Sequence, residues 1–154
     1  MPKAEEGQAN TWKEKSDRGL AAAEKGDFSD ARRHFEQAID ICRRASDAAA
    51  LSQLYDQLGD LHYRQGDQDA AVEAYKESLS LDQADRDAVG IARSYRGLGA
   101  AYQEKGDYDR AADSYEEAEA QLRQAEDEAE RAILLALQGS LQEEQGRYQK
   151  AKDY

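Results

Sequence analysis

Two arginines, Arg93 and Arg96, stand out in a chain that is otherwise strongly acidic. The 154 residues include 33 acidic and 21 basic side chains, which gives a formal net charge of −12. Residues three positions apart are neighbours on one face of a helix, and two adjacent guanidinium groups can hold a carboxylate through charge-assisted hydrogen bonds. The alternative is that these arginines pair with Asp56 or Asp60 on an adjacent helix. Both interpretations require a helix at Arg93.

No other arrangement of side chains indicates catalysis, a cofactor or a metal. His34 and His62 are the only histidines, and neither has cysteine or carboxylate neighbours at metal-ligand spacing. Cys42 is the only cysteine, so an internal disulfide is impossible, and we expect it to pack as a small apolar residue. No glycine-rich phosphate loop is present. We predict no enzyme, no cofactor and no metal site.

The acidic composition also restricts the class of partner. A surface of this charge repels phosphate backbones and anionic lipid, so we expect neither nucleic acid nor membrane as a partner. No apolar run reaches the length of a transmembrane helix, and the N-terminus has no signal-peptide core. We expect a soluble cytoplasmic protein. The acidic bias indicates either a salt-rich cytoplasm or ordinary acidic helix faces.

The element that positions the arginines repeats every 40 residues. Three sets of small residues keep this period: Gly26, Gly66, Gly106 and Gly146; Gly19, Gly59, Gly99 and Gly139; and Ala31, Ala71, Ala111 and Ala151. Repeats of this length are typical of stacked supersecondary units.

Each unit is predicted to be a helix hairpin. Tyr95, Leu98 and Tyr102 step by three and four residues, which marks one face of a helix. Gly106 can adopt a positive φ and end that helix, and Ala111 begins a second periodic face. The predicted helices cover residues 12–25, 28–45, 48–65, 68–82, 88–105, 108–125 and 129–145. A capping box at 11–14 starts the first helix after a disordered segment, 1–10.

Glycines inside the first helix of each unit need a compensating role. Each should cost roughly 1 kcal/mol relative to alanine. We expect the glycine of each unit to face the buried alanine of the second helix, for example Gly99 facing Ala111. A small residue opposite a small residue would then set the gap between the two helices.

The pattern resembles the tetratricopeptide repeat family over residues 12–154. The third unit carries the match most fully, with Tyr95, Leu98-Gly99, Tyr102, Gly106-Asp-Tyr108, Ala111, Tyr115 and Ala118. The second unit departs from it at Gln68 and Ser78, and the first at Lys15 and Arg18. The usual repeat of the family has about 34 residues. The 40-residue period here resembles the subclass found in kinesin light chains and spindle-orientation adaptors.

The resemblance implies an all-α, right-handed superhelical stack of antiparallel hairpins, with about three and a half repeats. The domain would cover 11–154, in units of approximately 12–46, 47–86, 87–126 and a truncated 127–154. The family binds peptides on the concave side, which the first helices line. The side chains expected there are Gln53, Asp56, Gln57, Asp60, Tyr63, Arg93, Arg96 and Gln103, with Gly97, Ala100, Ile133, Ala136, Leu137 and Ser140 beside them.

The resemblance thus predicts a protein-interaction module that acts as a scaffold or adaptor. The chaperone-tail clamp of some family members needs lysine and asparagine where this chain has Ser16 and Leu20, and a second asparagine where it has Gln57. We therefore do not predict chaperone-tail binding.

Other functions stay open because residues 133–137 are apolar on every side of their helix, and such a helix is expected to be buried all round. Either the natural chain continues into further repeats, or this helix mediates weak self-association. A regulatory arm of a larger enzyme or sensor is a third alternative.

Overall fold

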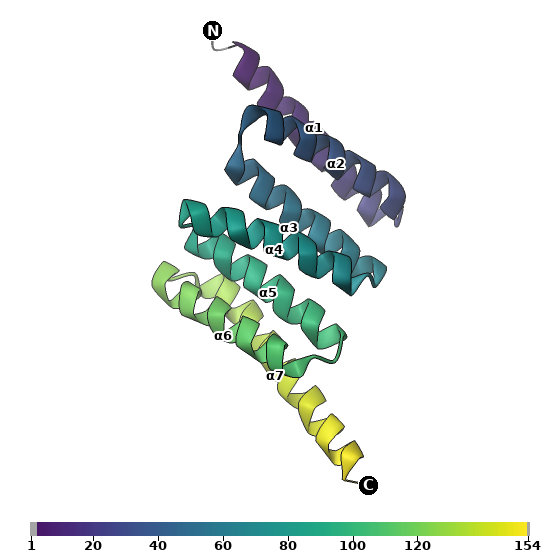
Figure 1. Ribbon diagram of the computed structural model, residues 1–154, viewed down its shortest axis with the longest axis vertical. Coiled ribbons are helices and arrows are strands. Elements are labelled where there is room, and N and C mark those ends of the chain that lie inside the picture. The colour runs from purple at the N-terminus through teal and green to yellow at the C-terminus, as the bar shows by residue number, and fades with distance from the viewer. Residues whose placement is uncertain (1–2, 154) are drawn as a thin grey trace.

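The computed structural model describes the backbone of residues 3–153 and the side chains of residues 11–153. This part of the chain contains seven α-helices and no strand, so the all-α prediction is confirmed. The helices are α1 (Lys3–Glu24), α2 (Phe28–Ala45), α3 (Ala48–Gln65), α4 (Gln68–Asp85), α5 (Ala88–Glu104), α6 (Tyr108–Ala125) and α7 (Glu128–Lys152). Figure 1 shows them stacked as antiparallel hairpins along the long axis of the molecule.

Aspartates begin the helices at a period of 20 residues, half that of the repeat. Each aspartate side chain accepts a hydrogen bond from the backbone N–H three residues further on, which satisfies one of the unpaired donors of the first turn. These N-caps are Asp27, Asp47, Asp67, Asp87, Asp107 and Asp127. The caps explain why the predicted and observed starts of α2 to α6 agree.

A residue with a left-handed backbone conformation follows each of the helices α1 to α6. The type of residue differs within and between hairpins. Within hairpins they are the glycines Gly26, Gly66 and Gly106, with φ of 80°, 79° and 76°. Between hairpins they are Ser46, Arg86 and Glu126, with φ of 54°, 58° and 55°. After both Gly26 and Ser46 the next N–H reaches back to a carbonyl of the preceding helix, which closes the end of that helix.

The first helix is longer than predicted. α1 begins at Lys3, so Thr11 lies inside the helix and the predicted capping box does not start it. Residues 3–10, which we expected to be disordered, are helical. No proline follows Pro2, so nothing in the covalent structure stops the helix from extending toward the N-terminus. Residues 1 and 2 lie outside the described residues.

The last helix is also longer than predicted. α7 passes through Gly146 without a turn, although Gly146 keeps the register of the three hairpin glycines. At those hairpins the residue after the glycine is an aspartate N-cap, whereas here it is Arg147, which has no acceptor for the backbone N–H groups of a new helix. A glycine therefore needs its capping partner to make the turn.

The glycines inside the first helices make room for aromatic rings rather than for alanines. A Cβ atom added at Gly19 would lie 2.7 Å from the Phe35 ring, and one added at Gly99 would lie 2.4 Å from the Tyr115 ring. Gly59 stands in the same relation to Tyr75, at 2.6 Å. The predicted contact of glycine with alanine is therefore wrong. The partner in each case is the aromatic residue four positions after the alanine, which lies one helical turn further along the second helix.

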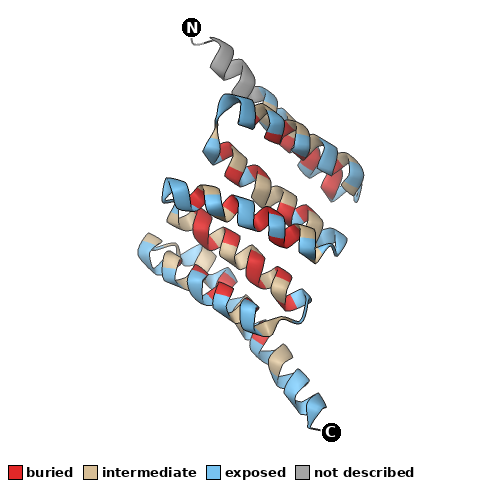
Figure 2. Cartoon of the chain, viewed as in Figure 1, coloured by how far each residue is buried: buried red, intermediate tan, exposed pale blue. Residues whose placement is uncertain are grey.

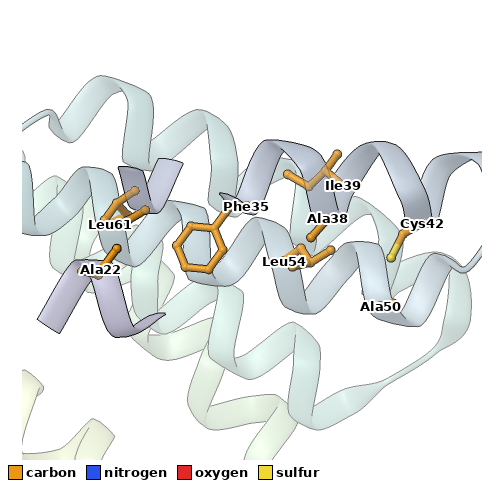
Figure 3. Packing of buried hydrophobic residues seen from close by; sticks show 10 residues of the cluster. Ala22, Phe35, Ala38, Ile39, Cys42, Ala50, Leu54 and Leu61 are labelled. Atoms are coloured by element: carbon orange, nitrogen blue, oxygen red, sulfur yellow. The ribbon is translucent and has the colours of Figure 1, made fainter. Parts of the chain in front are cut away.

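The core is divided between the interiors of the hairpins and the seams, which are the interfaces between neighbouring hairpins, as expected for a stack. In the cluster of Figure 3, Phe35 and Ile39 of α2 pack with Leu54 and Leu61 of α3. Cys42 belongs to this cluster and is completely buried, and burial raises the pKa of its thiol to about 11. It therefore serves as a core residue, as predicted.

The odd-numbered helices form one wall of the stack. α3 contacts α5, and α5 contacts α7, whereas no comparable contact joins α2, α4 and α6 in the described part of the chain. Ser16 of α1 donates to Gln57 of α3 at 2.7 Å, which extends this wall to the first hairpin. Figure 2 shows that buried residues follow the seams between helices, while the second half of α7 is mostly exposed. None of the helices that the structure describes is long and apolar enough to cross a membrane.

Candidate functional site

A pocket of about 220 Å³ opens on the wall of odd-numbered helices, between α3 and α5. It brings together five of the eight side chains predicted for the concave face: Asp56, Asp60, Tyr63, Arg93 and Arg96. The remaining lining residues are Tyr75, Gly97, Ala100 and Leu137.

Tyr75 forms part of the pocket, although its register with Phe35 and Tyr115 predicted only a core residue. Its ring lies between two glycines, since an added Cβ would come within 2.6 Å of it at Gly59 and within 2.5 Å at Gly97. Its hydroxyl donates to Asp60 at 2.6 Å. Burial and the nearby carboxylates raise the pKa of Tyr75, so the hydroxyl remains protonated as a donor. The glycines therefore let a core residue present a polar group to the surface.

The arginine pair does not have the ion-pair partners that the sequence suggested. Arg96 Nε lies 3.4 Å from a carboxylate oxygen of Glu130 in α7, without hydrogen-bond geometry. Within residues 11–153, neither arginine comes within ion-pair distance of Asp56 or Asp60. Arg93 has no hydrogen bond to another described side chain, so its donors are available to a ligand.

Asp56 is the most perturbed carboxyl of the pocket. Loss of hydration raises its pKa to about 6, and the charges of Asp82 and Asp60 act in the same direction. The Ser78 hydroxyl and the charge of Arg93 partly oppose this rise. The pocket therefore contains two arginines and two carboxyls, and the Asp56 carboxyl takes up a proton more readily than an ordinary aspartate.

The other three predicted residues lie outside the pocket. Gln53 is exposed and lines a smaller cavity of about 50 Å³ at the neighbouring end of α3. Gln57 accepts the hydrogen bond from Ser16. Gln103 is buried, where it accepts from the Tyr115 hydroxyl at 3.1 Å and donates to Glu144 at 2.9 Å. Gln57 and Gln103 thus join neighbouring helices of the wall.

A buried polar cluster behind the pocket was missed altogether. It consists of Ser52, Ser78, Asp82 and Ser94, all at most 5% exposed, and it reaches Asp56 at the pocket. A comparison of residues 40 apart could have revealed it, because those positions are mostly apolar in the other units. Among the described residues, no group of three or more histidine, cysteine, aspartate or glutamate side chains is arranged to hold a metal ion.

The fold and its wall define a class of protein, the α-solenoid built from helix hairpins. The tetratricopeptide repeat family model matches residues 9–84 and 90–154, and the chain belongs to that family. Among curated proteins, none has a matching sequence.

Solved structures agree on the fold. The TPR domain of Arabidopsis FLU superposes with a TM-score of 0.70 at 20% identity, over 76% of this chain and 98% of that one. BtubC (BKLC) from P. vanneervenii superposes with a TM-score of 0.68 at 21% sequence identity. The match covers 73% of this chain and 46% of BtubC, so this chain spans about half the length of BtubC. The TPR2AB domain of yeast Sti1, solved in a complex with pHSP90, superposes with a TM-score of 0.69 at 16% sequence identity. The match covers 91% of this chain and 51% of the Sti1 chain.

Proposed function

We propose that the chain is a protein-interaction module that binds a peptide or protein segment on the wall of odd-numbered helices. The observation that carries the proposal is the pocket between α3 and α5, which contains the free donors of Arg93 and the hydroxyl-bound carboxylate of Asp60. Its walls are helices that are already fixed by their caps and by packing against their neighbours. This protein therefore loses little conformational entropy when it binds a partner. In this role the chain acts as a cytoplasmic scaffold or adaptor without catalytic activity.

The Sti1 domain was solved in complex with pHSP90. We expect the partner of this chain to be different. Two of the three positions of the chaperone-tail clamp, Ser16 and Gln57, are engaged within the protein, whereas the third, Leu20, is not. Ser16 is 4% exposed and bonded to Gln57, and Leu20 is an exposed apolar residue. Recognition through Arg93 and Arg96 thus uses a different part of the wall.

Charge reversal of the arginine pair tests this proposal. Peptides selected by the wild-type protein from a displayed random library should bind Arg93→Glu/Arg96→Glu at least tenfold more weakly, because each charge-assisted hydrogen bond is worth roughly 1.5–3 kcal/mol. Binding is measured by isothermal titration calorimetry, with circular dichroism as the check on folding.

The matched control is Arg32→Glu/Arg44→Glu, which makes the same change of charge at exposed positions of α2. This control should bind the selected peptides as the wild type does, apart from a small long-range effect that salt removes. Equal affinity of the wild type and the Arg93/Arg96 variant would exclude this pocket as the binding site.

A second candidate function is self-association through α7. Ile133 and Leu135 are 45% and 60% exposed on this helix, and a Cβ at Gly139 would meet nothing within 4 Å. Sedimentation velocity across a concentration range should then show dimers that Leu135→Lys abolishes. A monomer at the highest concentration would exclude self-association.

A further inference from the structure

The joint between the second and third hairpins carries polar side chains at interior positions that are apolar in the neighbouring repeats. Its helices α3, α4 and α5 contribute three serines and an aspartate to the interior. Residues 40 positions away show what replaces them in the other hairpins: Ala38 and Ala118 for Ser78, Cys42 and Leu122 for Asp82, and Leu54 and Leu134 for Ser94. The polar residues are therefore a property of this joint and not of the repeat.

The cluster links two carboxyl groups through hydroxyls. Ser94 Oγ lies 3.2 Å from Asp56 Oδ1 and 3.4 Å from Asp82 Oδ2. Ser52 donates to the other oxygen of Asp82, and Ser78 Oγ lies 3.4 Å from Asp82 and 3.1 Å from Ser94 Oγ. Asp82 is 4% exposed, so its carboxyl depends on these hydroxyls in place of water.

The backbone of α5 is shaped to fit the Asp82 carboxyl. A Cβ atom added at Gly90 would lie 2.6 Å from Asp82 Cγ. The residues in register with Gly90 are Ala50 and Glu130, so a glycine occurs only where the facing residue is the aspartate. Two separate features of the sequence, the aspartate and the facing glycine, therefore serve the same buried carboxyl.

The hydroxyls supply too few protons for both carboxylates. Ser52, Ser78 and Ser94 each donate one, while Ser78 also lies 3.0 Å from the backbone carbonyl of Ser52. If Ser94 donates to Asp82 and Ser78 donates to the Ser52 carbonyl, then Asp56 has no hydroxyl donor within the cluster. A proton on Asp56 resolves this competition, because Asp56 can then donate to Ser94 Oγ while Ser94 donates onward.

The charges around Asp56 are mixed, with carboxylates predominating. Asp60 lies one turn away on α3, Asp82 and Asp85 come from α4, Asp87 precedes α5, and Arg93 and Arg96 come from α5, with Glu130 of α7 next to Arg96. α1 contacts this part of α3 through the neutral hydroxyl of Ser16, which bonds to Gln57.

We propose that this joint is a proton-sensitive contact, in which one proton held on Asp56 and shared through Ser94 with Asp82 strengthens the packing of the second hairpin on the third. Loss of the proton places two linked carboxylates in one interior and weakens the joint. The burial and charges that raise the pKa of Asp56 to about 6 support this direction.

The sign of the effect follows from proton binding. A carboxyl whose pKa is higher in the folded than in the unfolded chain binds protons preferentially in the folded state. Its contribution to stability is therefore greatest below about pH 4 and is lost as the pH rises to about 6. A rise from 3.8 to about 6 corresponds to roughly a hundredfold change in the folding equilibrium constant.

The test compares urea unfolding from pH 4 to pH 7.5 in the wild type, Asp56→Asn and the control Asp113→Asn. Asp113 is exposed on α6, so its replacement makes the same charge change away from the joint. The amide introduced by Asp56→Asn can donate a hydrogen bond to Ser94 Oγ, as a protonated Asp56 would. Asp56→Asn should gain ten- to hundredfold in the folding equilibrium constant relative to Asp113→Asn at pH 7.5, and nothing at pH 4.

A second measurement needs no folding comparison. Carbon-13 NMR of the side-chain carboxyls should show Asp56 titrating near pH 6 in the wild type and closer to its ordinary value in Ser52→Ala/Asp82→Asn. Titration of Asp56 near pH 4 in the wild type, or equal gains for Asp56→Asn and Asp113→Asn at pH 7.5, would overturn the proposal. Neither measurement uses a ligand, so its outcome is independent of the proposed peptide binding.

Discussion

Replacing Leu134 with alanine is expected to lower the unfolding free energy by roughly 2–5 kcal/mol, whereas the same change at Leu135 should stay within about 0.5 kcal/mol. Leu134 is 1% exposed in a cluster with Leu122 and Tyr115 of α6. Leu135 is 60% exposed. Because alanine is the best helix former, neither change weakens the helix itself. The difference therefore reports only the packing of α7 on its neighbours.

Urea unfolding followed by circular dichroism measures both variants. In a stack, neighbouring units interact in pairs, so Leu134→Ala is expected to produce an early transition of α7 ahead of the remaining helices. Equal losses for the two leucines would show that both sides of α7 are covered. If the loss at Leu135 grew with protein concentration, the cover would be a second copy of the chain.

Alanine at Gly99 and alanine at Gly139 are expected to have opposite effects on stability, although the two positions share one register. The added Cβ at Gly99 meets the completely buried ring of Tyr115 at 2.4 Å, and overpacking of this kind costs about 1–3 kcal/mol. At Gly139 the added Cβ meets nothing within 4 Å. There the better helix propensity of alanine should gain about 0.5–1 kcal/mol.

Thermal unfolding of the two variants and the wild type checks the signs. Gly59→Ala is a further control and should resemble Gly99→Ala, because the Tyr75 ring lies 2.6 Å from the added Cβ. A gain at all three positions would mean that the rings shift freely and that the glycines have no packing role.

The helices were predictable because their signals are local. Asp47 caps α3 through a contact three residues away, and Gly66 ends it through its own φ. The exceptions show the limits of such signals. Gly146 keeps the register of the hairpin glycines, but no aspartate cap follows it, and the helix continues. The partner of Gly99 was mispredicted because a 40-residue period fixes which residues are equivalent but not how far one helix is displaced along the next.

The candidate site was predictable in outline only. The resemblance to the tetratricopeptide repeat family placed Asp56, Asp60 and Arg93 on the concave face, and the structure brings them to one pocket. The contact of Arg96 with Glu130 depends on how α7 crosses α5, which one sequence does not reveal. The burial of Asp82 is also difficult to predict. An ionisable side chain is buried only where other residues supply its hydrogen bonds, and the sequence does not show which residues these are.

The residues between hairpins have a further consequence for how such a chain can diversify. Ser46, Arg86 and Glu126 adopt nearly the same left-handed backbone, although their side chains are neutral, basic and acidic. All three are exposed. An aspartate N-cap follows each of them, and after Ser46 and Arg86 the N–H of that aspartate also bonds back to the preceding helix. Side-chain identity is consequently free at these corners, so the outer edge of the solenoid can acquire new chemistry without any change in the way its hairpins stack.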